Sequence, residues 1–216
     1  MTRGDLPQPA LILASASPRR VALLRQIGLE PEEILPAELD ETPLKGELPR
    51  ACAIRLADAK ARVIADQLDR PALVLAADTI VAVGRRILQK AENPQQARAY
   101  LALLSGRRHT VYTAISIRPS KALAEGRCAS RVVASKVAFS CLTPHHIEAL
   151  ITAGDWQGKA GGYALQGMAA RFIRFISGSP SAVIGLPLFE TSQLLQGQPH
   201  PWFQPGATES ATSHRT

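Results

Sequence analysis

The sequence has few aromatic residues, few cysteines and no long apolar run, and each scarcity excludes a class of protein. Only 5% of the 216 residues are Phe, Trp or Tyr, which leaves little material for a surface that stacks single-stranded bases. Cys52, Cys128 and Cys141 are far apart and show no CxxC or Cys/His metal spacing, so we expect reduced, buried thiols. No apolar run approaches the roughly 18–20 residues that span a bilayer.

What is present is typical of a globular chain. Apolar residues make up 46% and charged residues 20%, and the length fits one domain or two lobes that share a sheet. The apolar stretch near the start runs only from Ala10 to Ala14, which is not the layout of a signal peptide. We expect a soluble, cytoplasmic protein with a single domain over residues 1–196. We expect residues 197–216, which contain no Leu, Ile or Val, to form a disordered tail.

The charge is basic. Twenty-five Lys and Arg against eighteen Asp and Glu give a net charge of +7, which suits nucleic acid, a membrane surface or phosphorylated small molecules. An excess of solvated surface charge explains the number equally well. No block of five or six like charges marks a nucleic-acid-binding tail, so the position of each basic residue matters more than the total.

The periodicity indicates a mixed α/β fold. Apolar runs and alternating residues predict strands, and 3.6-residue periodicity with Gly or Pro at the boundaries predicts helices. We expect strands over 11–14, 33–37, 72–83, 87–88, 111–117, 131–139, 171–176 and 182–184, and helices over 19–27, 48–68, 94–104, 144–151 and 187–195.

The segment Ser15-Ala16-Ser17-Pro18-Arg19-Arg20 joins the first strand to the first helix. Ser17 suits the cap and Pro18 the first helical position. The first turn of a helix attracts anions, so two arginines there are locally unfavourable by a few tenths to about 1 kcal/mol. A bound phosphate chain would compensate. The alternative is an ordinary capped helix whose arginines point to solvent.

Two charged residues fall within apolar patterns. Asp78 lies in the apolar strand 72–83, and a buried carboxylate there requires a cation or hydrogen bonds. It suits a metal ligand or a general base as well as a structural network. Lys60 lies on the apolar face of the helix over 48–68, so it either reaches the edge or projects into a cavity. Glu41 and Lys90, taken alone, would be solvated charges.

A glycine-rich segment, Gly158-Lys-Ala-Gly-Gly-Tyr-Ala-Leu-Gln-Gly167, matches neither a Walker A loop nor GxGxxG. Its glycines permit positive φ or a close approach of the backbone. A loop that lines a ligand site and a tight structural turn fit this spacing equally well.

Together these segments resemble the Maf family of nucleotide pyrophosphatases, in the family's order from about residue 11 to 196. The segments that carry the resemblance are SASPRR at 15–20, Asp40-Glu41, RLADAKA at 55–61, AADTIV at 76–81, Ile87-Leu88-Gln89-Lys90, Leu104-Ser105-Gly106, GKAGGYALQG at 158–167 and GLPLFE at 185–190.

The resemblance implies an elongated α/β fold, with a strongly bent mixed sheet flanked by helices and two lobes around a central cleft. It implies hydrolysis of nucleoside triphosphates to monophosphate and pyrophosphate with a divalent cation, Mg²⁺ or Mn²⁺, and it suggests a homodimer. Asp78 falls on the position of the catalytic base. The family's other active-site positions fall on Ser15, Arg20, Glu41, Lys60 and Lys90.

Arg19, Thr79 and Gln166 are similar to the branch of the family that acts on dTTP and UTP. We expect Gln166 and Thr79 to contact the pyrimidine, and Glu41 and Asp78 to hold the metal. Whether Asp78 serves as base, as ligand or as both stays open.

Two alternatives remain. The substrate could be a modified or different nucleotide, such as 5-methyl-UTP, pseudouridine triphosphate or CTP. The chain could also be a nucleic-acid-binding or cell-division regulatory protein with a vestigial site, which its net charge favours and its few aromatic residues disfavour. We expect a nucleoside triphosphate as the partner, without a stable nucleic-acid partner or a membrane.

Overall fold

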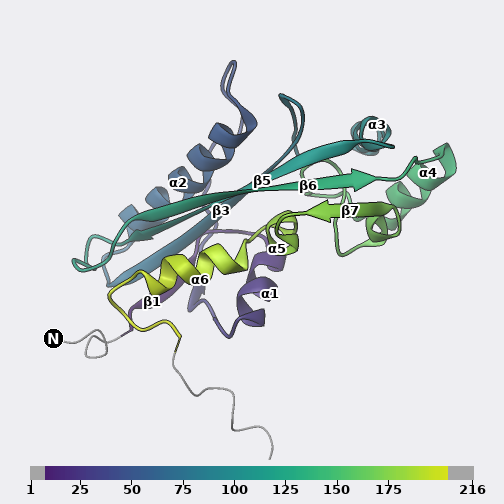
Figure 1. Ribbon diagram of the computed structural model, residues 1–216. Helices are drawn as coiled ribbons and strands as arrows, with labels where there is room; N and C mark the ends of the chain where they lie inside the picture. The colour runs from purple at the N-terminus through teal and green to yellow at the C-terminus, as the bar shows by residue number, and fades with distance from the viewer. Residues whose placement is uncertain (1–7, 204–216) are drawn as a thin grey trace, which may run out of the picture.

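A computed structural model describes residues 8–203 and shows a sheet with helices on its faces (Figure 1). The strands are β1 (Ala10–Leu13), β2 (Glu33–Ile34), β3 (Ala72–Val83), β4 (Arg86–Leu88), β5 (Arg108–Pro119), β6 (Ala129–Phe139) and β7 (Ile173–Ser177). The helices are α1 (Pro18–Gln26), α2 (Pro49–Gln67), α3 (Pro94–Leu104), α4 (Pro144–Ala153), α5 (Pro180–Ile184) and α6 (Leu188–Gln196), with a 3₁₀ helix, η1, over Met168–Arg171. The predicted mixed α/β fold is confirmed.

The sheet leaves part of one strand edge open. Its order is β2-β1-β3-β5-β6-β7, and β4 also pairs with β3. On one edge of β3, the parallel strand β1 pairs with residues 72–75 and the antiparallel strand β4 with residues 81–83. The other edge pairs with β5 from Leu73 to Ala82. Residues 76–80 therefore have a strand neighbour on one side only, and Asp78 and Thr79 lie in this interval.

Alternation along the strands gives the sheet two apolar faces. Helix α2 packs on one face, with Leu56 and Ile64 among the buried residues that join it to β3. Helices α1 and α6 cover part of the other face and α3 and α4 another part (Figure 1). On this second face Thr79 and Thr113 are polar, between the apolar clusters on either side.

The strand predicted over 182–184 is wrong. These residues belong to helix α5, because the Ser179 side chain caps it by accepting a hydrogen bond from Ala182 N, and Pro180 occupies its first turn. The apolar triplet 182–184 resembles a short strand when it is considered without its cap. The second strand is also shorter than predicted, ending at Ile34.

The disordered tail that we predicted from residue 197 is not seen over residues 197–203. Gln198 and Trp202 are 2% and 7% exposed, and the Gln198 side chain hydrogen-bonds both backbone groups of Arg127 at 2.9 Å. Trp202 belongs to the apolar cluster under α1 and α6. The remaining tail residues, 204–216, lie outside the described residues.

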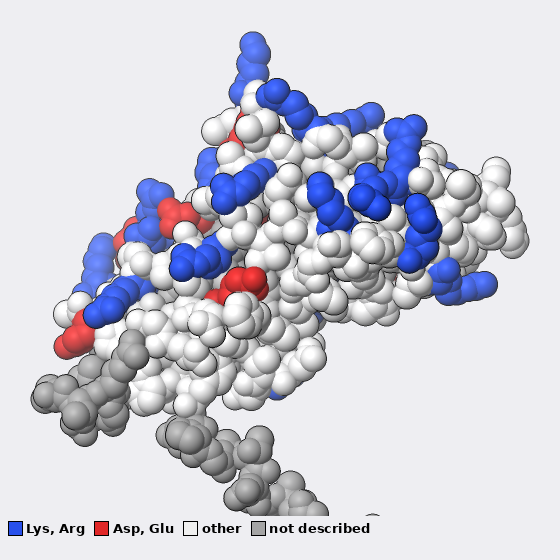
Figure 2. Space-filling model, in the orientation of Figure 1, with Lys and Arg blue, Asp and Glu red and all other residues white. Residues whose placement is uncertain are grey.

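Two other expectations concern the cysteines and the length of the apolar segments. All three thiols are free, but only Cys52 is buried, whereas Cys128 and Cys141 are exposed. Within residues 8–203, no helix has both the length and the apolar character needed to cross a bilayer. Figure 2 shows Lys and Arg side chains distributed along the visible face rather than in a single band.

Candidate active site

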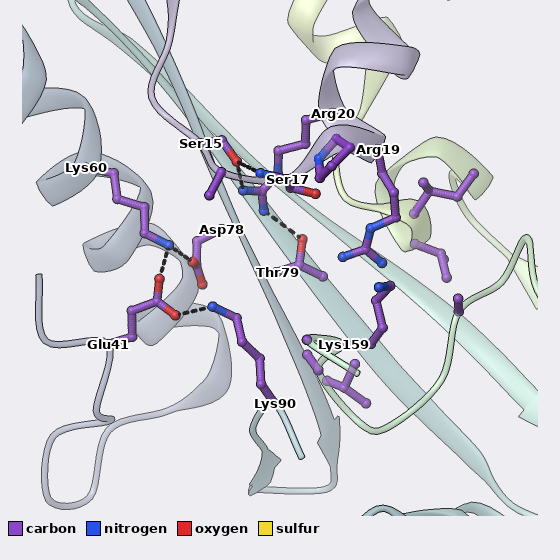
Figure 3. Close-up of a pocket in the computed structure, with 18 of the residues that line it drawn as sticks. Ser15, Ser17, Arg19, Arg20, Glu41, Lys60, Asp78, Thr79, Lys90 and Lys159 are labelled. Carbon is purple, nitrogen blue, oxygen red and sulfur yellow. Dashed lines mark hydrogen bonds and ion pairs between the residues drawn. The ribbon is translucent and has the colours of Figure 1, made fainter. Parts of the chain in front are cut away.

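A cavity of about 500 Å³ opens beside residues 76–80 of β3, on the edge that has no strand neighbour. It is lined by residues of the segment after β1, the start of α1, the loop before α2, α2, β3, the loop after β4, the glycine-rich segment and α5. It brings together all the predicted site residues except Gln166, namely Ser15, Arg19, Arg20, Glu41, Lys60, Asp78, Thr79 and Lys90 (Figure 3).

Lys60 joins two carboxylates at one side of this cavity. Its Nζ lies 2.5 Å from Asp78 Oδ1 and 2.6 Å from Glu41 Oε1, so these two oxygens are no more than about 5.1 Å apart. Lys90 Nζ contacts Glu41 Oε2 at 2.6 Å. Lys60 and Asp78 are 6% and 5% exposed. The lysine on the apolar face of α2 therefore projects into the cavity and neutralises the strand carboxylate.

Glu41 and Asp78 differ in whether one of their carboxylate oxygens is still without a partner among the described residues. Burial raises the pKa of Glu41, but Lys60 and Lys90 outweigh it and hold this pKa at about 2, so Glu41 is ionised at neutral pH. Both of its oxygens are engaged. In the described part of the chain, no hydrogen bond or ion pair reaches Asp78 Oδ2. Asp78 therefore keeps one oxygen that can accept a proton or bind a cation.

Arg20 is held by neutral acceptors on three elements. Its Nη1 donates to Ser15 Oγ at 2.8 Å, its Nε to Gly185 O at 2.9 Å, and its Nη2 lies 3.5 Å from Thr79 Oγ1. Burial lowers the pKa of Arg20, and the charges of Asp78 and Glu41 partly oppose this. The guanidinium keeps its positive charge, because the ordinary pKa of an arginine lies far above neutral pH.

Ser17 occupies the cap position of α1, but its side chain makes no capping hydrogen bond. Instead, Ser15 Oγ accepts a hydrogen bond from Ser17 N at 3.2 Å as well as from Arg20. Ser15 thus fixes the turn that leads from β1 into α1, and it places the arginine beside β3.

Two further cations, Arg19 and Lys159, lie on the other side of the cavity from Lys60. Figure 3 shows the ends of Arg19 and Lys159 pointing toward one another. Within residues 8–203, no carboxylate lies within ion-pair distance of Arg19, Arg20 or Lys159. Burial lowers the pKa of Arg19 and of Lys159, and a neighbouring arginine (Arg20 and Arg19, respectively) lowers each further.

The glycine-rich segment lines the cavity because its backbone docks on β4. Gly161 N donates to Leu88 O at 3.1 Å, and Ala160 forms a bridge with Lys90. Gly161 has a φ of 72°, and a Cβ there would lie 2.8 Å from Val81 Cγ1. Of the two interpretations of this segment, the structure supports a loop that lines a site.

Gln166 lies apart from the other predicted site residues. It is exposed, and it is absent from the cavity wall, whereas the preceding Leu165 contributes to the wall. The next residue, Gly167, is packed so closely on Asp155 that a Cβ would lie 2.1 Å from Asp155 Oδ2. The same oxygen accepts a hydrogen bond from Met168 N at 2.7 Å, which fixes the end of this segment.

Two supporting contacts were missed at the sequence level. Tyr163 lines the cavity, and its hydroxyl lies 2.7 Å from Nε2 of His109, which is 2% exposed. Burial lowers the pKa of His109 to about 4, so the ring is neutral. Thr113 Oγ1 lies 3.1 Å from Thr79 Oγ1 and donates to Ala182 O at 2.7 Å. The alternation predicted over 111–117 gives a signal for Thr113, which lies on its apolar face, whereas His109 lies on the same face of β5 but before the predicted start of the strand.

Comparison with known proteins gives a consistent set of relatives. The profile of a family described as Maf-like protein matches residues 10–198. A dTTP/UTP pyrophosphatase of Gluconobacter oxydans (strain 621H) is 59% identical over 192 residues, 89% of this chain and 88% of that protein. A dTTP/UTP pyrophosphatase of Rhodopseudomonas palustris (strain HaA2) is 52% identical, over 91% of this chain and 95% of that protein. The solved structure of a HAM1 protein from Coxiella burnetii shares the fold, with a TM-score of 0.50 and 16% identity over 88% of this chain and 100% of that one.

Proposed function

The chain belongs to the Maf family, and we propose that it is a nucleoside triphosphate pyrophosphatase that hydrolyses dTTP and UTP to the monophosphate and pyrophosphate. The names of the relatives and the extent of the match support this assignment. We propose that the enzyme acts on the cytoplasmic nucleotide pool, including modified nucleotides, and that it is a homodimer as the resemblance implies.

The observation that carries the proposal is the excess of positive charge in the cavity. Its wall holds five basic side chains, Arg19, Arg20, Lys60, Lys90 and Lys159, and two acidic ones, Glu41 and Asp78. The carboxylates neutralise the two lysines with which they pair, and three cations remain without an acidic partner in the part of the chain that the structure describes. An anion with several charges, such as a triphosphate chain, complements this excess.

The positions of the side chains suggest a division of roles. Arg20, held toward the cavity by Ser15, would bind phosphate oxygens in two-point contacts, together with Lys60 and Lys90. Asp78 Oδ2 would orient the attacking water and accept its proton. Such catalysis depends mainly on positioning and on stabilising the charge of the departing pyrophosphate.

The residues present fit a divalent metal ion. Mg²⁺ usually binds one or two carboxylates together with the phosphates of its substrate, and it prefers oxygen ligands. Asp78 Oδ2 offers such an oxygen, and Glu41 would supply a second one where the ion displaces Lys60 or Lys90 from it. We propose that these two residues hold the ion. When bound, Mg²⁺ or Mn²⁺ would supply positive charge to the phosphoryl oxygens.

The experiment that tests the proposal is a panel of nucleoside triphosphates with Mg²⁺ or Mn²⁺, in which pyrophosphate and single phosphate are measured separately. We expect pyrophosphate from dTTP and UTP. Faster release from 5-methyl-UTP, pseudouridine triphosphate or CTP would change the substrate but keep the reaction. Release of single phosphate, or no turnover with salt-dependent DNA binding, would overturn the proposal. The intact ion-pair network argues against a vestigial site.

A further inference from the structure

We propose that Thr113, which is absent from the cavity wall, is a positioning residue for Arg20. Its hydroxyl ties strand β3 and helix α5 together beside the atoms with which these two elements hold the guanidinium. This inference rests on the proposed function of the cavity, in which Arg20 binds phosphate oxygens.

Arg20 is oriented by acceptors that lie far from it in the sequence. Its Nη2 lies 3.5 Å from Thr79 Oγ1 on β3, and its Nε donates at 2.9 Å to the carbonyl of Gly185, the C-cap of α5. Both acceptors are neutral, so they orient the guanidinium without cancelling its charge. An arginine side chain has many rotamers, and fixing one of them costs entropy. The guanidinium therefore keeps its direction only while both acceptors stay in place.

Thr113 contacts both of these supports. Thr79 and Thr113 are opposite each other on β3 and β5, and their Oγ1 atoms lie 3.1 Å apart. Thr113 Oγ1 also donates to Ala182 O of α5 at 2.7 Å. Ala182 lies three residues before Gly185, which is within one helical turn. A Cβ on Gly185 would lie 3.6 Å from Thr79 Oγ1 and 3.7 Å from Arg20 Nε, so the end of α5 packs directly against both side chains.

Helix α5 depends on the sheet for its position. It has five residues, and so short a helix is unstable in isolation. Two hydroxyls of the sheet anchor it. Ser135 Oγ of β6 accepts from Ser179 N at 3.1 Å and donates to Ser179 O at 3.3 Å, just before the helix begins. Thr113 binds Ala182 within the helix, so it is the anchor closer in sequence to the carbonyl of Gly185.

The Thr113 hydroxyl is buried between apolar neighbours on its face of β5. Thr113 is 0% exposed, and Val111 and Ile115 precede and follow it on this face. A buried hydroxyl is costly unless it is hydrogen-bonded, and valine fills nearly the same volume without that cost. The hydroxyl therefore contributes the position of α5 and β3 rather than apolar packing.

The test measures the affinity for inorganic tripolyphosphate by calorimetry, because this ligand carries phosphates without a base or a sugar. Thr113→Val removes the hydroxyl and Thr113→Ser keeps it. We expect the affinity to fall about 10-fold in Thr113→Val, the lower end for a hydrogen bond to a charged group, and by less than about 2-fold in Thr113→Ser. Thr110→Val is the matched control. Thr110 is a buried threonine on the opposite face of β5, so this variant should lose stability without losing affinity.

A double-mutant cycle separates positioning from general damage to the fold. Arg20→Met removes the group through which Thr113 acts, so Thr113→Val should lower the affinity no further when it is added to Arg20→Met. An equal fall in both backgrounds would overturn the inference, and so would an unchanged affinity in a folded Thr113→Val variant. If Thr113→Val does not fold, Thr113→Ala takes its place in the cycle.

Turnover of UTP distinguishes failure of this inference from failure of the proposed function. If tripolyphosphate binding depends on Thr113 but no nucleoside triphosphate is hydrolysed, the proposed function fails and the role of Thr113 stands. If UTP is hydrolysed and Thr113→Val leaves the tripolyphosphate affinity unchanged, only the role of Thr113 fails. A wild type that does not bind tripolyphosphate also overturns that role.

Discussion

Replacing Lys60 with Met should destabilise the protein in a way that depends on pH. Lys60 is the cation between two carboxylates, and it is 6% exposed. Methionine has a similar length and no charge, so the substitution keeps the packing on α2 and removes only the ammonium group. Asp78 and Glu41 then face each other without the cation between them.

The geometry sets the size of the effect. With oxygens no more than about 5.1 Å apart, two carboxylates repel each other by at least about 3 kcal/mol at an effective dielectric constant of about 20. The Glu41 side chain is 37% exposed, and solvent screening reduces this value. Breaking a buried pair costs about 3–5 kcal/mol in general, and this cost already includes the charge that is left uncompensated. We expect a loss of about 3 kcal/mol at pH 7.

Denaturant unfolding at pH 7 and pH 5 measures the effect. Protonation of one carboxylate removes the repulsion, and the folded variant then binds that proton more readily than the unfolded chain. The difference from the wild type should therefore shrink as the pH falls. Lys90→Met is the control, because Lys90 pairs with Glu41 alone and its side chain is 59% exposed, so we expect a loss under about 1 kcal/mol. Equal stability of Lys60→Met and the wild type at pH 7 would refute this reasoning.

Two further predictions concern residues that support the wall of the cavity. Burial lowers the pKa of His109 from 6.5 to about 4, so the unfolded chain binds a proton at a higher pH than the folded protein does. The free energy of unfolding should therefore fall by up to about 3 kcal/mol as the pH falls through this range. His109→Phe, which also removes the Tyr163 contact, should flatten the unfolding free energy over this window, and an unchanged pH profile would contradict it. Gly161→Ala should lower the denaturation midpoint by the equivalent of about 1–3 kcal/mol, because the new Cβ meets Val81 at 2.8 Å. Gly162→Ala, at a similar φ with its nearest atom at 3.5 Å, should be milder, and the reverse order would contradict this account.

Much of the fold follows from local signals. Strand β3 matches its predicted range over 72–83, because the apolar run is bounded by Pro71 and by Gly84, whose φ of 59° suits the turn into β4. Helix α5 was missed although Ser179 and Pro180 supply a cap and a first turn. A short apolar triplet outweighed the capping signal in the prediction.

The site was predicted less completely, since its parts meet only through tertiary structure. Asp78 and Lys60 stood out as charges in apolar patterns, and the structure pairs them. Glu41 gave no local signal, because its loop is polar, and only the resemblance singled it out. The buried end of the tail was missed because one Trp in a polar segment contributes little to a periodic pattern, although Trp202 has a partner surface in the folded core.

The central claim is that Asp78 acts at the centre of a site that releases pyrophosphate from dTTP and UTP. Its most direct test is the rate of pyrophosphate release from UTP by Asp78→Asn in the presence of Mg²⁺, with unfolding measured on the same sample. We predict a loss of several orders of magnitude in a folded protein, because the amide cannot accept a proton from water. A folded Asp78→Asn variant that releases pyrophosphate at the rate of the wild type would contradict the account.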